Sequence, residues 1–190
     1  MAINDNAVFT AATGYVYIAP VGTPAPTPLE LADFDPENFG ITDASEWSPI
    51  GHTGEDELPE FGYEGGETET RGTWQKKQLR EVTTEAPVDY MTLKPLQFDE
   101  ETLELYYGPN KSEVEGVYAV DSTAEGGIER ALLVIMVDGL FKIGHTAAKV
   151  SIRRDESISL ASDAFSVLPI RATYLKHPGR HLFEWILPAA

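Results

Sequence analysis

Histidines, clustered carboxylates and tryptophans are the side chains of this 190-residue chain whose types could support chemistry. The four histidines are the candidate metal ligands and proton carriers: His52, His145, His177 and His181. None has the spacing of a metal motif such as H-E-x-x-H, and the "PGR" between the last two breaks any helix that would align them. We therefore interpret the histidines as exposed or internally satisfied side chains.

The carboxylates of "GEDE" (residues 54–57) suggest calcium, but the D-x-D-x-D-G spacing of a calcium loop is missing. There is no G-x-S-x-G elbow, P-loop or dinucleotide fingerprint, and Gly65-Gly66 is more simply a turn or bulge. A glycosidase needs two paired acids, and among 31 Asp and Glu residues no pair stands out. The absence of cysteine excludes thiolate metal sites and cysteine nucleophiles. The sequence therefore predicts no catalytic residue, no metal and no cofactor.

The three tryptophans allow two interpretations, a carbohydrate-binding surface or residues of the core and of interfaces. They could form a platform on which a carbohydrate stacks, although tryptophans of β-proteins more often lie in cores or interfaces. Trp47 and Trp185 sit among strand-like residues and are predicted to be core residues. Trp74 lies in a polar stretch, which favours an interface.

The composition of the chain argues against two classes of binding partner, nucleic acids and membranes. A formal net charge of −17 argues against general binding to nucleic-acid phosphates, which requires a basic face. The longest clean apolar run, residues 131–137, is too short to span a bilayer, so no membrane partner is expected. The first residues, "MAINDNAVFTAATG", lack the basic region of a signal peptide, which favours a protein made and used in a cytoplasm or released by lysis.

The elements that would position these residues are mostly strands. Val, Ile, Thr and Tyr are plentiful and long helical patterns are missing, so we expect one mostly β domain over residues 1–190, a β-sandwich or barrel with one flanking α-helix and long loops. Its loop at about 20–46 is rich in proline and longer than most connections. Strands are expected in the following stretches: 14–20, 47–52, 88–97, 128–138, 148–160, 167–177 and 181–189.

One helix is expected in "FDEETLELYYG". Asp99 is a good N-cap, and Gly108 followed by proline ends the helix. Phe98 and Leu103 are placed for a hydrophobic staple. The residues expected to pack this helix on a sheet are Phe98, Leu103, Tyr106 and Tyr107.

A polar segment, residues 62–86, reads as β-structure with almost nothing to bury. Residues 53–70 hold seven acids and no base, whereas residues 71–80 hold four bases and no acid. A solvated hairpin with matching charges is one interpretation. A charged rim complementary to another subunit is the other.

The order of these features resembles the major tail protein, or tail tube protein, of long non-contractile-tailed bacteriophages, especially those of actinobacteria. The resemblance rests on "WSPIGHTGEDELPEFGYEGGETETRGTW", "PVDYMTLKPLQFDEETLELYYG", "ALLVIMVDG" and "SVLPIRATYLKH", which together span roughly residues 14–187. The most distinctive parts are W-x-x-I-G-H-T, the polar segment and the helix ending in "YYG".

The resemblance implies a structural virion protein of the phage tail, assembled in the host cytoplasm. Family members form rings, generally hexameric, that stack into a hollow tube. The tape-measure protein occupies the lumen before DNA passes through without specific binding, and terminator and distal tip proteins close the ends. A virion decoration protein or a carbohydrate-binding β-sandwich is the alternative, and an enzyme comes third.

Under this resemblance the polar segment would be satisfied by pairing with neighbouring subunits. The residues assigned to the shared sheet are Thr68, Thr70, Arg71, Trp74 and Val82. Glu67 and Glu69 are assigned to the lumen, where acids would let DNA slide. The residues assigned to contacts between stacked rings are Pro26, Phe34, Glu57 and Phe61.

Overall fold

The computed structural model describes residues 3, 8–35, 46–55, 57–122, 126–160 and 162–188. It confirms the mostly β fold, with an eight-stranded sheet, a separate two-stranded sheet and two short helices. The strands are β1 (Thr13–Ala19), β2 (Ser48–Pro49), β3 (Glu60–Glu64), β4 (Thr68–Arg71), β5 (Arg80–Thr83), β6 (Val88–Leu93), β7 (Ile128–Asp138), β8 (Phe141–Arg154), β9 (Ile170–Tyr174) and β10 (Glu184–Ile186); the helices are α1 (Pro28–Ala32) and α2 (Glu100–Tyr107).

The large sheet is antiparallel and runs in the order β2-β1-β7-β8-β9-β6-β3. The β7–β8 hairpin is its spine, and β8 is long enough to have two partners on its other side. Its first half pairs with β10 and its last residues pair with β9. The sheet therefore divides at β8, and the β9-β6-β3 branch is free to turn away from β1 and β7.

Strand β7 is buried on both faces, which explains its uninterrupted apolar run. Leu132 and Val134 point into one core cluster, whereas Leu133 and Ile135 point into a second. Because side chains alternate along a strand, one short stretch of sequence supplies both cores.

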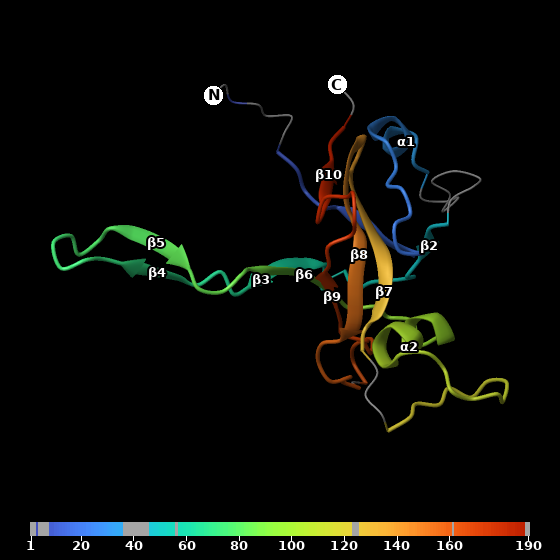
Figure 1. The fold of residues 1–190 in the computed structure, drawn as a ribbon. Helices are drawn as coiled ribbons and strands as arrows, with labels where there is room; N and C mark the ends of the chain where they lie inside the picture. Colours follow the sequence, from blue (N-terminus) through green and yellow to red (C-terminus); the bar gives the residue numbers. More distant parts are fainter. Residues whose placement is uncertain are drawn as a thin grey trace.

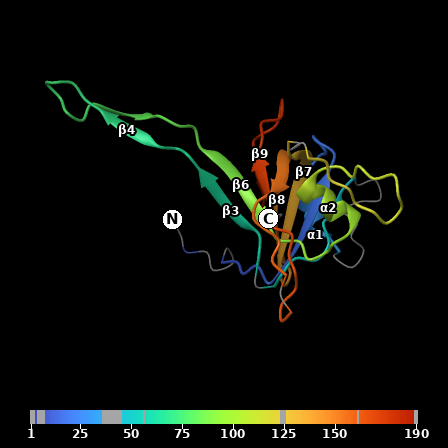
Figure 2. The same cartoon turned by 90° about the horizontal axis from the view of Figure 1, so that it is seen from below.

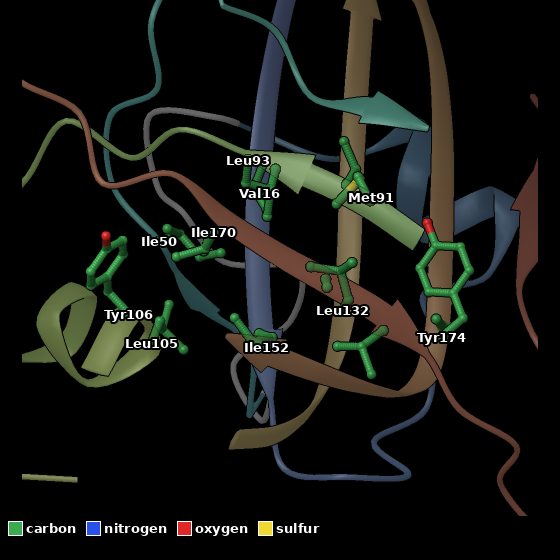
Figure 3. Close-up of a cluster of buried hydrophobic side chains, with 14 of the residues drawn as sticks. Val16, Ile50, Met91, Leu93, Leu105, Tyr106, Leu132, Ile152, Ile170 and Tyr174 are labelled. Carbon is green, nitrogen blue, oxygen red and sulfur yellow. The ribbon is translucent and has the colours of Figure 1, made fainter. Parts of the chain in front are cut away.

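The first cluster forms where β6 and β9 turn over the face of β1 and β7. Figure 3 shows Met91 and Leu93 of β6 and Ile170 of β9 directed toward residues of the other branch, among them Val16 and Leu132. This arrangement is sandwich-like, although the strands belong to one continuous sheet. In the stretch 167–177 every second residue is buried, namely Leu168, Ile170, Ala172 and Tyr174, as alternation along a strand requires.

Helix α2 covers the end of this cluster, and its predicted caps are confirmed. The Asp99 carboxylate accepts a hydrogen bond from the Thr102 backbone N–H at 2.9 Å, and Gly108 ends the helix at φ +95°. Leu105 and Tyr106 are buried, and Leu103 is partly buried against them. Two further residues assigned to helix packing, Phe98 and Tyr107, are 46% and 38% exposed. The sequence analysis did not assign Leu105, which is the most buried apolar residue of the helix at 3% exposed.

The second cluster lies on the opposite face, under the proline-rich loop. This loop holds α1, which the sequence did not predict. Leu31, Phe34 and Trp47 are buried there against Tyr17 and its neighbours, which confirms the core prediction for Trp47. The Lys142 ammonium fixes the end of α1 by donating to the carbonyls of Ala32 and Phe34, both at 2.7 Å. Residues 36–45 of the predicted loop lie outside the described residues.

The polar segment, residues 62–86, projects from the body as a hairpin arm. Figures 1 and 2 show β4 and β5 far from the main sheet, joined to it through β3 and β6. Every residue from 67 to 88 is exposed except Val82, which is partly buried. The core of the body is thus complete without the arm.

Candidate assembly surface

The root of the arm is the part where β3 pairs with β6. Side chains of these two strands and of β9 pack together there and hold the root on the body. Arg171 lies over the Tyr90 ring, 3.6 Å from its centroid, and donates to a Glu64 carboxylate oxygen at 2.7 Å. Gly62 makes room for the ring, because a Cβ there would lie 2.6 Å from Tyr90 Cζ. The hydrogen bond from Arg171 lowers the pKa of Glu64, so this pair is charged near neutral pH. This group is not visible in the sequence, because its members lie on three different strands, β3, β6 and β9.

Two glycines separate the root from the outer hairpin. Gly65 and Gly66 have φ values of +74° and +76°, a conformation that other residues rarely adopt. The two glycines lie in an irregular break between strands, since β3 ends at Glu64 and β4 begins at Thr68. The outer hairpin therefore forms a sheet of its own.

The register of β4 with β5 sorts the arm residues onto two faces. Thr70 lies opposite Glu81, whereas Arg71 lies opposite Arg80. Directly opposed residues share a face and the faces alternate along each strand. One face carries Thr68, Thr70, Glu81 and Thr83, and the other carries Glu69, Arg71, Arg80 and Val82. The residues assigned to a shared sheet are therefore close together but divided between the faces.

The outer edges of the hairpin are open to a further strand. In the described part of the chain, β4 and β5 pair only with each other. The Thr84 N–H donates to the Glu67 carbonyl at 2.8 Å, and bonded pairs alternate with non-bonded pairs along an antiparallel ladder. The backbone N–H groups of Thr70 and Glu81 therefore point outward, one from each edge.

The tip of the arm, residues 71–80, is ordered by its own backbone. The Thr73 N–H donates to the Lys76 carbonyl at 2.7 Å, and the Lys76 N–H donates back to Thr73 at 3.1 Å. Gly72 is required there, because a Cβ would lie 2.0 Å from the Lys77 carbonyl oxygen. This turn holds Trp74 at the apex with 94% of its surface exposed. A bulky apolar side chain presented in this way is typical of a contact surface.

The four residues assigned to ring stacking occupy different environments. Pro26 and Phe34 are buried within their own subunit, where Phe34 packs edge-on against Tyr15 at 5.5 Å. Their side chains therefore hold the loop on its sheet, and the face that this loop offers outward carries exposed residues such as Leu29 instead. Glu57 is half-buried and pairs with Lys94 at 2.7 Å.

Phe61 belongs to an aromatic patch beside the arm root. It lies 4.7 Å from the His145 ring and 5.4 Å from Trp185. Trp185 is 48% exposed, so the prediction that it is a core residue is wrong. The reason is that β10 is the outer partner of β8, and alternation buries its neighbour Ile186 instead.

His145 is the one buried histidine among the described residues. Its ring is 1% exposed, and its Nδ1 atom has no hydrogen-bond partner within the described chain. Burial lowers its pKa to about 4, so the imidazole is neutral near pH 7. Four aromatic rings surround it: Phe61, Tyr174, Phe183 and Trp185.

The described ranges hold no group of side chains suited to bind a metal ion. No three His, Asp or Glu side chains there converge closely enough to hold a metal ion. Asp56 of the "GEDE" stretch lies outside the described residues. None of the described helices has the length and apolar character needed to cross a membrane.

The described chain has a mostly β body with a buried core and an exposed polar hairpin whose strands pair only with each other, an arrangement typical of a surface that contacts another subunit. The chain belongs to the phage tail tube protein family, whose family model matches residues 1–190. It is 51% identical over 189 residues to the major tail protein Gp23 of Mycobacterium phage L5, covering 98% of this chain and 93% of that protein. It is 50% identical over 187 residues to the major tail protein Gp23 of Mycobacterium phage D29, with the same coverage.

Family membership confirms the resemblance found in the sequence. The protein is a structural component of the virion tail, a major tail tube protein, and it is not an enzyme.

Proposed function

We propose that this protein is the repeating subunit of rings, six subunits being the expected number, that stack into the hollow tail tube. The tape-measure protein fills the lumen until DNA passes through at ejection, and terminator and tip proteins close the two ends. Assembly takes place in the host cytoplasm. Family membership supports the tube, and the arm is the observation that carries the mechanism of assembly.

The outer hairpin of the arm, β4 and β5, supports assembly because it pairs with no other strand of the described chain. An isolated two-stranded hairpin is marginally stable in water, and open strand edges invite pairing with another chain. The edges of β4 and β5 are open in this way in the described structure. Strand addition by a neighbouring subunit satisfies them, and repetition around a ring leaves no edge free.

In this arrangement one face of the sheet shared between subunits lines the water-filled lumen of the tube. Thr68 and Thr70 lie on one face of the hairpin, and Arg71 and Val82 lie on the other. Glu69 shares the Arg71 face and forms an ion pair with it at 3.2 Å. The lumen is proposed to lie on the side of Glu67 and Glu69, whose carboxylates would repel DNA phosphates, while Arg71 and Arg80 share this face at the tip of the arm.

Thr70→Pro is the variant that tests strand addition. It removes the outward N–H at the β4 edge while leaving the inward bonds of the hairpin in place. We expect the variant to remain a monomer across a concentration series, as seen by size-exclusion chromatography and negative-stain electron microscopy, under conditions where the unaltered protein forms rings or tubes.

Two matched variants complete the experiment. Thr70→Ala keeps the N–H and should assemble normally, whereas Glu81→Pro removes the outward N–H of the other edge. Tubes formed by both proline variants would contradict strand addition by the arm. A protein that stays monomeric at every concentration but binds sugar or calcium would favour the alternative, a decoration or carbohydrate-binding module.

A further inference from the structure

An acidic cleft lies at the root of the arm. It has a volume of about 480 Å³, and its apolar wall includes Leu58 and Ile170. Five carboxylates and one lysine line it: Glu55, Glu57, Glu60, Asp155, Glu156 and Lys94. The single lysine is bonded to Glu57 at 2.7 Å, so the cleft keeps a large excess of negative charge. Since no three acids of the described chain are placed to hold a metal, a protein cation is the better match.

The tip of the arm has the opposite character. Residues 71–80 carry four bases and no acid in a chain of net charge −17. Lys76 and Lys77 flank the apex, where Trp74 is 94% exposed. A tryptophan with basic residues close to it in the chain matches a cleft that has an apolar wall and an acidic rim, because aromatic anchors supply binding energy and complementary charges supply specificity.

The tip is too far away to fill the cleft of its own chain. Glu60 lines the cleft and begins β3, and an extended chain rises about 3.3 Å per residue. From Glu60 to Trp74 this amounts to at most roughly 45 Å, directed away from the body. The tip and the cleft are thus two separate surfaces on one subunit.

We propose that the tip of the arm, anchored by Trp74, docks in the acidic cleft of a second copy of this chain. The proposal rests on the proposed tube function and deepens it by naming the receiving surface. Because two different surfaces meet, the contact is head-to-tail, and such a contact either closes a ring or continues along a filament. The contact also brings the arm of one subunit against the loop of its neighbour that carries Glu57.

A disulfide cross-link tests the contact directly, since the chain has no cysteine of its own. Gln75→Cys places a thiol at the tip and keeps Trp74, and Leu58→Cys places one in the cleft. Mixing these single variants under assembly conditions and oxidising them should give a covalent dimer, because docked residues come within disulfide reach. The chain carrying both substitutions should give a ladder of higher oligomers.

Val114→Cys is the control, since Val114 is 65% exposed and is not among the residues that line the cleft. Dimers of the Gln75 and Leu58 variants no more abundant than those of the Gln75 and Val114 variants, in samples that contain tubes, would overturn the docking and leave the tube function standing. Tip-to-tip dimers of Gln75→Cys alone would also overturn it. Absence of both tubes and dimers at every concentration would count against both proposals.

Charge reversal gives a second test that does not depend on a thiol. Lys76→Glu with Lys77→Glu should raise the concentration needed for assembly about tenfold, and Glu60→Lys with Glu156→Lys should do the same. Combining the four substitutions should restore assembly. The matched control, Lys176→Glu with Arg180→Glu on the loop before β10, should have no effect. Unchanged assembly of the tip variant, or no recovery in the fourfold variant, would overturn the docking.

Discussion

At the scale of single residues, His145 shows how an aromatic patch is held together. Its imidazole lies edge-on to Trp185 at 4.7 Å and is buried by four rings, of which Tyr174 is buried and the other three are partly exposed. Removing a charged imidazole from water is costly, which is why its pKa falls to about 4. The histidine therefore acts as a neutral packing residue near pH 7.

This burial predicts that the subunit loses stability in mild acid. Below the ordinary histidine pKa of about 6.5 the unfolded chain takes up a proton that folded His145 does not, so the free energy of unfolding falls as the pH falls. Between pH 7.5 and 5 the loss from this group should be about 2 kcal/mol. Urea denaturation of dilute protein across this range measures it.

His145→Phe separates this contribution from that of the many carboxylates. The variant keeps an aromatic ring in the patch and cannot titrate, so its stability should fall by about 2 kcal/mol less over the same pH range. His52→Phe, which removes an exposed histidine, should follow the unaltered protein. Parallel curves for all three proteins would contradict the assignment.

At the scale of elements, local signals were sufficient for some parts of the fold and not for others. Helix α2 was predictable because its caps lie within a few residues of each other. Helix α1 also has such a signal, Thr27 and Glu30 as a capping box, but prolines on either side obscured it. The faces of the arm were not predictable, because the register of β4 with β5 is set by pairing rather than by a hydrophobic pattern.

The independence of the arm from the body gives the second prediction. Excising residues 67–84, so that Gly66 joins Glu85, should change the free energy of unfolding by less than about 1 kcal/mol, because exposed residues away from packed features contribute little. The shortened protein should nevertheless fail to form tubes. Chemical denaturation and negative-stain microscopy of the same sample measure the two effects.

Leu133→Ala is the control that shows the denaturation assay to be sensitive. This side chain is fully buried, and such truncations cost about 2–5 kcal/mol. A large loss of stability on removing the arm would mean that it packs on the body. Tubes formed without it would remove the arm from assembly.

At the scale of the whole molecule, the distribution of charge bears both on how subunits assemble and on how DNA passes through the tube. The chain has a net charge of −17, while four of its 14 bases lie within the tip of the arm. If those bases are covered by the cleft of a neighbour, the assembled tube exposes mostly acids. The sequence pattern already places four bases within residues 71–80, but only the register of the hairpin shows that Arg71 and Arg80 lie opposite each other at one tip.

The last prediction concerns the surface that lines the lumen of the tube, through which DNA is proposed to pass. Tubes of Glu67→Lys with Glu69→Lys should retain short linear duplex DNA at low salt and release it as salt rises, because phosphate binding weakens steeply with ionic strength. Tubes of the unaltered protein should retain none. Co-sedimentation of labelled DNA measures retention, and Glu113→Lys with Glu115→Lys on the loop after α2 is the control of equal charge.

Closed circular DNA cannot thread a tube, so lysines in the lumen should hold linear DNA alone. Equal retention of circular DNA would place Glu67 and Glu69 on the outer wall.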